Sequence, residues 1–260
     1  MTDSASWPTV KRPLIAILRG IRPDEAESIV EALIDSGFEL IEVPLNSPEP
    51  FASIERLSQR FGKDCLIGAG TVLSAADCAR VADVGGRLMV APNVDADVLA
   101  TARARRMVTM PGVFTPTEAL LALRCGASAL KFFPASVLGP SGIAAQLAVL
   151  PKDVVAGAVG GVSEKNLAAY VAAGIRAFGL GSRNDGGRGA RQGARLGPRL
   201  RPGLDRGDGK QRVRSAGRRG ADRDRRRGNR SSVPILKFVG SIEEAASTKP
   251  GVIPSAARDL

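Results

Sequence analysis

Short apolar runs recur along the first 182 residues and alternate with longer stretches of mixed polarity. The runs span residues 14–18, 39–43, 65–70, 87–91, 107–110, 129–133, 154–159 and 177–181. Each run is continuously apolar, a pattern typical of parallel strands that are buried on both faces. The pattern therefore predicts eight buried strands.

The stretches between these runs carry the signals that start and end helices. A proline followed by two acidic residues at 23–25 opens one helix, and Gly37 ends it. Ser74 precedes a second helix, and residues 163–164 lead a third that ends at Gly174. Eight strands separated by helices at even spacing predict an α/β fold of the (β/α)8 TIM barrel class. An open flavodoxin-like or Rossmann sheet is the alternative.

The chain changes character after Ser182. Residues 183–230 contain seventeen basic and five acidic side chains, a net charge of +12, and show no apolar stripe. The eighth helix of the barrel is therefore missing from the pattern, and we divide the chain into a barrel at 1–182 and a non-globular Arg/Gly-rich tail at 183–260. The tail composition resembles a disordered linker. It also resembles GC-rich coding DNA read in the wrong frame, and a frameshift is the hypothesis that we favour.

The overall charge of +11 and the pI near 10.4 belong to the tail, because the first 182 residues carry seventeen basic and eighteen acidic side chains. A basic block can bind nucleic acid through phosphate contacts. Residues 183–230 lack aromatic side chains for base stacking, which weakens that alternative. No apolar run reaches the length of a membrane span, and no signal-peptide pattern begins the chain. We expect a cytoplasmic protein without membrane or nucleic-acid partners.

The chain contains no histidine, and its three cysteines, Cys65, Cys78 and Cys125, share no metal-ligand spacing. The absence of histidine excludes Ser-His-Asp and Cys-His triads and any histidine-ligated metal. We expect neither a metal nor a cofactor. The cysteines fit small buried side chains in a reducing compartment.

Two charged residues interrupt the predicted strands. Lys131 is the one lysine of the first 182 residues inside an apolar run. A desolvated ammonium loses its proton more readily, and the neutral amine can attack a carbonyl. Glu42 lies at the predicted C-terminal end of the second strand, where barrel active sites are built, so we expect both residues in one site. A lysine that reaches solvent, or a structural ion pair, would explain them without catalysis.

Glycine-rich loops follow the seventh and eighth predicted strands, at 160–161 and 179–182. In TIM barrels these two loops commonly hold phosphate through backbone N–H groups. Arg19, just past the first strand, adds a cation at the same end, and Thr71, after the third strand, adds a hydroxyl. These residues predict a phosphorylated ligand near Lys131.

Six motifs occur in the order LIAILRGI, IEVPLNSP, IGAGTV, ALKFFPAS, AVGGV and GLGS. Together they resemble the 2-dehydro-3-deoxy-6-phosphogalactonate and 2-dehydro-3-deoxy-6-phosphogluconate aldolases over residues 12–182. The resemblance implies a homotrimeric barrel without metal. Such an enzyme would cleave a sugar acid phosphate to pyruvate and glyceraldehyde 3-phosphate through a lysine Schiff base.

The resemblance also implies individual roles. Lys131 would form the Schiff base, and Glu42 would shuttle protons. The substrate-binding residues would be Arg19 and Thr71 at the pyruvate carboxylate, Phe133 and Pro92 at the walls, and Gly160, Gly161 and Ser182 at the phosphate. Gluconate-specific relatives carry arginine and threonine in place of Asn46 and Val159, which favours the galactonate epimer. A gluconate-type or mixed-specificity aldolase, and an inactive barrel with a scrambled end, are the remaining alternatives.

Overall fold

The computed structural model describes residues 5–181, in which strands and helices alternate. The strands are β1 (Leu14–Ile17), β2 (Leu40–Pro44), β3 (Leu66–Gly70), β4 (Leu88–Val90), β5 (Val108–Met110), β6 (Gly112–Val113), β7 (Leu130–Phe132), β8 (Ala156–Val159) and β9 (Ala177–Gly181). The helices are α1 (Pro23–Asp35), α2 (Pro50–Phe61), α3 (Ala75–Asp83), α4 (Ala96–Ala104), α5 (Pro116–Arg124), α6 (Ala135–Leu147) and α7 (Leu167–Ala172).

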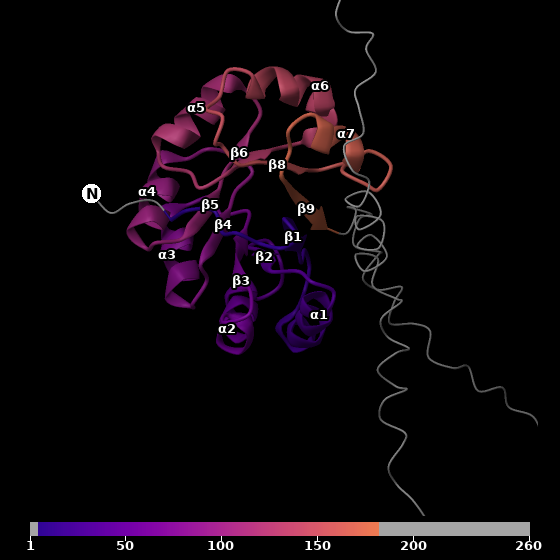
Figure 1. Ribbon diagram of the computed structural model, residues 1–260. Coiled ribbons are helices and arrows are strands. Elements are labelled where there is room, and N and C mark those ends of the chain that lie inside the picture. The colour runs from indigo at the N-terminus through magenta and orange to yellow at the C-terminus, as the bar shows by residue number, and fades with distance from the viewer. Residues whose placement is uncertain (1–4, 182–260) are drawn as a thin grey trace, which may run out of the picture.

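The strands close into a barrel with the helices around it (Figure 1). Every pair is parallel, in the order β5-β4-β3-β2-β1-β9-β8-β7-β6. β5 and β6 are two halves of one strand, interrupted at Pro111. The Ala129 N–H donates to the Thr109 carbonyl at 3.0 Å and the Lys131 N–H to the Pro111 carbonyl at 2.9 Å, which joins β7 to this strand. The eight strand positions confirm the (β/α)8 prediction.

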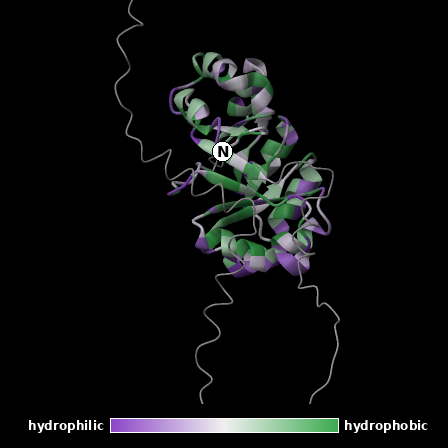
Figure 2. Cartoon of the chain, turned by 90° about the vertical axis from the view of Figure 1, so that its right-hand side faces the viewer, coloured by the Kyte–Doolittle hydropathy of each residue, from purple (hydrophilic) through white to green (hydrophobic). Residues whose placement is uncertain are grey.

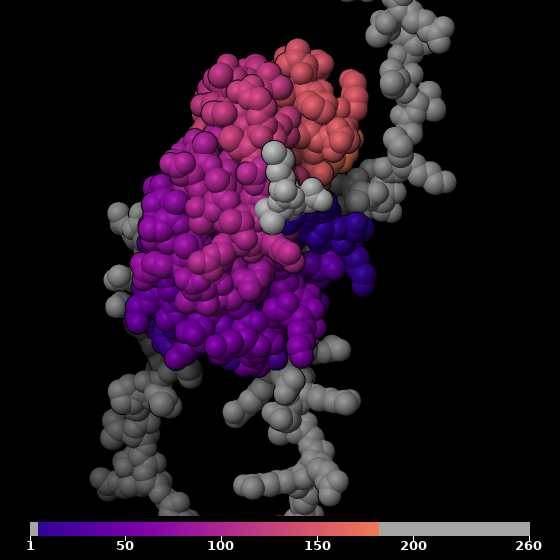
Figure 3. Space-filling model, turned by 90° about the vertical axis from the view of Figure 1, so that its left-hand side faces the viewer, coloured from indigo at the N-terminus to yellow at the C-terminus, as the bar shows by residue number. Residues whose placement is uncertain are grey.

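Consecutive strand–helix units are also neighbours in space. In the space-filling view the colour passes gradually around the molecule from the N-terminal to the later segments (Figure 3). This order brings β9 back beside β1, to which it is hydrogen-bonded. The predicted loss of the eighth helix, the tail at 183–260 and the boundary at residue 182 lie outside the described residues and stay predictions.

Three sequence-based boundaries differ from the structure. β6 was not anticipated, because the apolar run at 107–110 stops at Pro111. The helix expected from 163–164 begins at Leu167, and residues 163–166 form a turn in which Asn166 Oδ1 accepts the Ser163 N–H at 2.7 Å. Glu42 lies in the middle of β2 and not at its C-terminal end, because the strand extends to Pro44. The start and end of α1 and the Ser74 cap of α3 are confirmed.

Strand side chains alternate between two apolar layers. One buried cluster lines the barrel interior and contains Ile15, Leu40, Leu88, Val90, Met110, Ala129 and Ala177. Their neighbours along the strands, such as Leu14, Ile41 and Leu130, belong to the larger cluster between barrel and helices. Figure 2 shows the same division, with hydrophobic strands inside and hydrophilic residues on the outer helical faces. Burial on both sides explains why the strand runs are continuously apolar.

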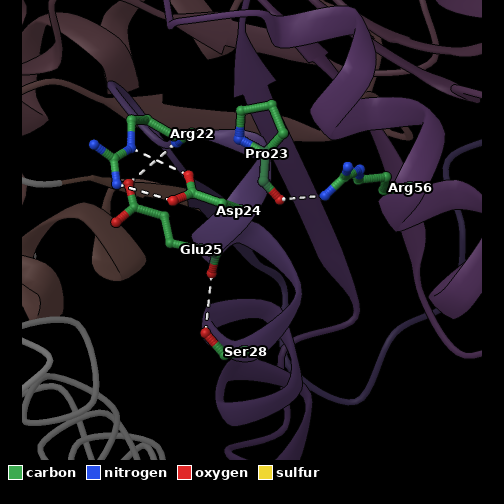
Figure 4. Close-up of polar contacts among 6 residues, drawn as sticks. All are labelled: Arg22, Pro23, Asp24, Glu25, Ser28 and Arg56. Atoms are coloured by element: carbon green, nitrogen blue, oxygen red, sulfur yellow. Dashed lines mark hydrogen bonds and ion pairs between the residues drawn. The ribbon is translucent and has the colours of Figure 1, made fainter.

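Helix α1 begins at Pro23, shortly after Arg19 in the chain, and Figure 4 shows the polar contacts of its first turn. Pro23 occupies its first turn, and the Arg22 guanidinium forms an ion pair with Asp24 at 3.0 Å. Arg56 of α2 donates to the Pro23 carbonyl at 3.3 Å. A proline and acidic residues in the first turn favour a helix start, so the end of the Arg19 turn is anchored.

The N-terminal segment covers the end of the barrel at which the strands begin. Trp7 and Val10 pack against the interior cluster, and Ser128 Oγ donates to the Ala5 carbonyl at 2.6 Å. No helix within residues 5–181 is long and apolar enough to cross a membrane.

Trp7→Ala is expected to lower the free energy of unfolding by about 1–3 kcal/mol, because the half-buried indole shields apolar side chains of the barrel interior. Urea unfolding measures this loss, and Trp7→Phe should restore most of it. An alanine variant with an unchanged unfolding midpoint would show that the N-terminal segment contributes no packing energy.

Candidate active site

Lys131 and Glu42 face the barrel interior from opposite parts of the chain. Inward positions alternate along a strand. Lys131 follows Ala129 by two residues on β7, and Glu42 follows Leu40 by two on β2, where Ala129 and Leu40 belong to the interior cluster. The lysine is 6% exposed and the glutamate 3%. The strand positions therefore point both side chains toward the barrel interior, and their convergence in one active site stays a prediction.

Gly70 makes room for the Glu42 carboxylate. A Cβ atom placed on Gly70 would collide with Glu42 Oε2, so a larger residue would displace the carboxylate. Gly70 is the last residue of β3, and its backbone carbonyl accepts the Leu45 N–H at 2.8 Å. The sequence reasoning missed this residue, although the glycine in IGAGTV was a usable signal.

The two buried charges shift each other's titration. Burial raises the pKa of Glu42, and the positive charges of Lys131 and Arg19 partly offset that rise. Burial lowers the pKa of Lys131, with Glu42 opposing this change and Arg19 reinforcing it. No hydrogen bond or ion pair within residues 5–181 joins the two directly. Near neutrality Lys131 is therefore unprotonated more often than a solvated lysine would be.

Phe133 connects Lys131 to the loop after β8. The Lys131 Nζ atom lies 4.9 Å from the centroid of the Phe133 ring. A Cβ atom on Gly160 would lie 3.4 Å from the same ring, which is van der Waals contact. The Phe133 ring therefore lies next to both the amine and the glycine loop.

The loop at 160–161 presents free backbone donors. Gly160 and Gly161 both adopt left-handed conformations, with φ of 88° and 78°. Their carbonyls are used, since Gly160 O accepts the Ser136 N–H at 3.0 Å and Gly161 O accepts from Asn166 Nδ2 at 2.9 Å. Neither glycine N–H donates to a group within the described part of the chain. Two adjacent free N–H groups suit an anion such as a phosphate.

Arg19 and Thr71 lie in the loops after β1 and β3. The exposed Arg19 side chain donates through Nη1 to Asn46 Oδ1 at 2.7 Å, and its charge reaches both Glu42 and Lys131. Thr71 is half-buried and has φ of 56°, an unfavourable conformation for a β-branched residue. Such strain is concentrated at functional sites.

The other residues named from the sequence lie around the same end of the barrel. Val159 ends β8 and is 6% exposed. Pro92 follows β4, and its backbone packs so closely on Gly112 that a Cβ atom there would collide with it. No hydrogen bond or ring contact within residues 5–181 joins Pro92 or Thr71 to Lys131. Ser182 lies outside the described residues.

The described residues contain no group of three or more histidine, cysteine or carboxylate side chains that could hold a metal ion. Cys65 and Cys78 are buried and Cys125 is half-buried, and all three are free thiols. Burial raises the pKa of the Cys65 thiol to about 12 and that of the Cys78 thiol to about 11, so neither is a reactive thiolate.

Comparisons with known proteins identify close relatives. The KDPG and KHG aldolase family matches residues 9–184. A curated relative from Rhizobium meliloti (strain 1021), "Probable 2-dehydro-3-deoxy-6-phosphogalactonate aldolase", is 64% identical over 180 residues, covering 69% of this chain and 85% of the relative. A solved protein described as "Native KDPGal structure" is 39% identical with a TM-score of 0.72, covering 93% of this chain and 98% of its own. A KDPG aldolase from Legionella pneumophila, with pyruvate captured as a covalent carbinolamine intermediate, is 26% identical with a TM-score of 0.63, covering 70% and 88%.

Proposed function

The chain belongs to the KDPG and KHG aldolase family of carbon–carbon lyases, and we propose that it cleaves 2-dehydro-3-deoxy-6-phosphogalactonate to pyruvate and glyceraldehyde 3-phosphate. The observation that carries the proposal is Lys131, the one buried lysine within residues 5–181, which faces the barrel interior together with Glu42. The name of the R. meliloti relative supports the substrate. The covalent pyruvate adduct of the Legionella enzyme supports catalysis through an amine.

The chemistry begins with the neutral Lys131 amine. It attacks the C2 ketone of the substrate, and loss of water from the carbinolamine gives an iminium ion. A base then removes the C4 hydroxyl proton, and the electrons of the C3–C4 bond move toward the iminium. Glyceraldehyde 3-phosphate leaves with C4 as its aldehyde carbon. The remaining enamine takes a proton at C3, and hydrolysis of the resulting iminium releases pyruvate and the free amine.

Glu42 is placed to move these protons. Its raised pKa lets it donate a proton to the departing hydroxyl and accept one in a later step. Arg19 provides a positive charge for the pyruvate carboxylate, and Thr71 provides a hydroxyl. Phe133 and Pro92 border the reacting carbons. These roles form the proposed machinery, in which no metal or cofactor takes part.

The free N–H groups of Gly160 and Gly161 are proposed to bind the substrate phosphate. Gly160 lies beside the Phe133 ring, which also neighbours the Lys131 amine, so a bound substrate would extend from the amine along the ring to the loop. Ser182 is proposed to complete this phosphate site. Both ends of the sugar acid phosphate would then be held while C2 meets the amine.

Substrate choice is proposed to depend on Asn46 and Val159. The two epimers differ at C4, so discrimination depends on a few contacts near that carbon. We expect a higher kcat/KM for the galactonate than for the gluconate epimer. The corresponding difference in transition-state free energy should be on the order of 1–3 kcal/mol. Val159→Thr should reduce this preference, whereas Val171→Thr, the same change at an exposed position of α7, should leave it intact.

Cleavage assays with both epimers test the proposal directly. A preference for the gluconate epimer would support the gluconate-type alternative, and equal rates would support mixed specificity. Absence of cleavage with either substrate would support an inactive barrel.

We also propose a homotrimer in the cytoplasm. Several large apolar side chains are exposed, including Leu73 (55%), Val137 (70%) and Val149 (63%), and contact with other copies of the chain would cover such residues. The three free thiols fit a reducing compartment.

A further inference from the structure

Two turns at the open end of the barrel, where the strands end, are joined by hydrogen bonds to side chains of the second turn. The first turn, after β1, carries Arg19 and Gly20, and the second, after β2, carries Asn46 and Ser47. Arg19 Nη1 donates to Asn46 Oδ1 at 2.7 Å, and the Gly20 N–H donates to Ser47 Oγ at 3.0 Å. One bond therefore holds the Arg19 side chain, and the other holds the backbone next to it.

The first turn depends on this connection. Its closing hydrogen bond, from the Ile21 N–H to the Leu18 carbonyl, is long at 3.3 Å. Gly20 has φ of 81°, and a Cβ atom placed on it would meet nothing within 4 Å. Leu18 and Ile21 at the two ends of the turn are buried in the core, but no packing holds Gly20 at its tip, where the Ser47 hydroxyl is the contact.

The backbone around Ser47 is held by two hydrogen bonds. Its N–H donates to the Pro44 carbonyl at 2.9 Å, and the Leu45 N–H donates to the Gly70 carbonyl of β3 at 2.8 Å. The Ser47 side chain is buried, at 8% exposure, although it lies in a loop. A buried hydroxyl that accepts a backbone N–H is costly to remove, because the donor is left unpaired.

We propose that Ser47 is a positioning residue: by accepting the Gly20 N–H, its hydroxyl fixes the backbone from which the Arg19 guanidinium reaches Asn46 at the open end of the barrel. Without this bond only the Asn46 contact would hold the Arg19 side chain, and the backbone from which that side chain starts would be free to move. Its effect on the substrate carboxylate rests on the proposed aldolase function. The placement of the Arg19 charge near the buried pair does not depend on that function.

The charged groups that face Lys131 are Glu42 from β2 and Arg19 from the turn after β1. Because Arg19 lowers the pKa of Lys131, releasing the guanidinium should move the Lys131 titration to higher pH. This titration can be followed by NMR of ¹³Cε-labelled lysine in the full-length protein, with the Lys131 signal assigned by its absence in Lys131→Met. Arg19→Met sets the full size of the effect.

Ser47→Ala should shift the Lys131 titration in the same direction as Arg19→Met, and Ser47→Thr, which keeps the acceptor oxygen, should restore it. Ser53→Ala is the matched control, because Ser53 is also buried and its hydroxyl has no hydrogen-bond partner in the described part of the chain. It should leave the titration unchanged. If the alanine variant does not fold, Ser47→Cys, with a weaker acceptor, should give a smaller shift of the same sign.

Cleavage kinetics give the second readout. Ser47→Ala should raise KM about three- to tenfold, the effect of one lost hydrogen bond, with a smaller change in kcat. An alanine variant that melts earlier but matches Ser53→Ala in titration and KM would show a purely structural role and overturn the proposal. A titration shift in a protein whose wild type cleaves neither substrate would sink the aldolase proposal and leave the positioning role standing.

Discussion

Lys131→Met is expected to abolish both covalent trapping of pyruvate and aldol cleavage. In the wild type, borohydride should reduce the iminium formed with pyruvate to a stable secondary amine, which mass spectrometry can locate on Lys131. Burial lowers the pKa of this lysine, so its neutral amine is more available than that of a solvated lysine. The other four lysines within residues 5–181 are exposed and lack this advantage.

Lys131→Met leaves the buried Glu42 without its partner charge, and such a loss is destabilising unless the remaining group is neutralised. Because burial already raises the pKa of Glu42, protonation of that carboxyl should limit the loss, and the variant should still fold. Urea unfolding of the variant checks this point. Lys152→Met and Lys165→Met are the controls and should trap pyruvate as the wild type does. A label on Lys152 or Lys165 would contradict the assignment of Lys131.

The fold could be predicted because its strands are buried on both faces. Runs such as 14–18 and 177–181 are continuously apolar because one strand face meets the barrel interior and the other meets the helices. Helix starts were also readable where a cap acts over three residues, as at Ser74, whose Oγ accepts the Asp77 N–H at 3.1 Å. Local chemistry therefore accounts for most boundaries.

The errors have two local causes. Pro111 stops an apolar run but only interrupts a strand, because β7 bonds on both sides of it. Residues 163–166 form a turn, closed by the Ser163 N–H to Asn166 Oδ1 bond, before α7 begins at Leu167, and the apolar pattern does not separate such a turn from the first turn of a helix.

Contacts between distant residues explain what the sequence could not show in the site. Lys131 and Glu42 were visible as charges within apolar runs. The space that Gly70 leaves for Glu42, and the bond from Gly20 to Ser47, join residues whose neighbourhood is created only by the closed barrel. Small and polar residues are common in loops. Gly70 and Ser47 therefore could not be singled out from the sequence alone.

Glu42→Gln should slow turnover by about 10²–10⁴-fold, the usual size of a general acid–base contribution. The amide has nearly the shape of the protonated carboxyl, a form that burial already favours by raising the pKa of Glu42. The barrel should therefore accept glutamine, and pyruvate should still be trapped on Lys131.

The same substitution should change the pH dependence of trapping in a defined direction. The Glu42 carboxylate raises the pKa of Lys131, so removing its charge lowers that pKa and moves the onset of trapping to lower pH. Glu39→Gln is the matched control, because Glu39 is half-buried just before β2 and accepts the Lys11 N–H at 2.7 Å, at the end of the barrel where the strands begin. It should leave both turnover and the trapping profile unchanged. Wild-type turnover in Glu42→Gln would reduce Glu42 to an electrostatic partner of Lys131, and proton transfer would then have to come from another group or from water.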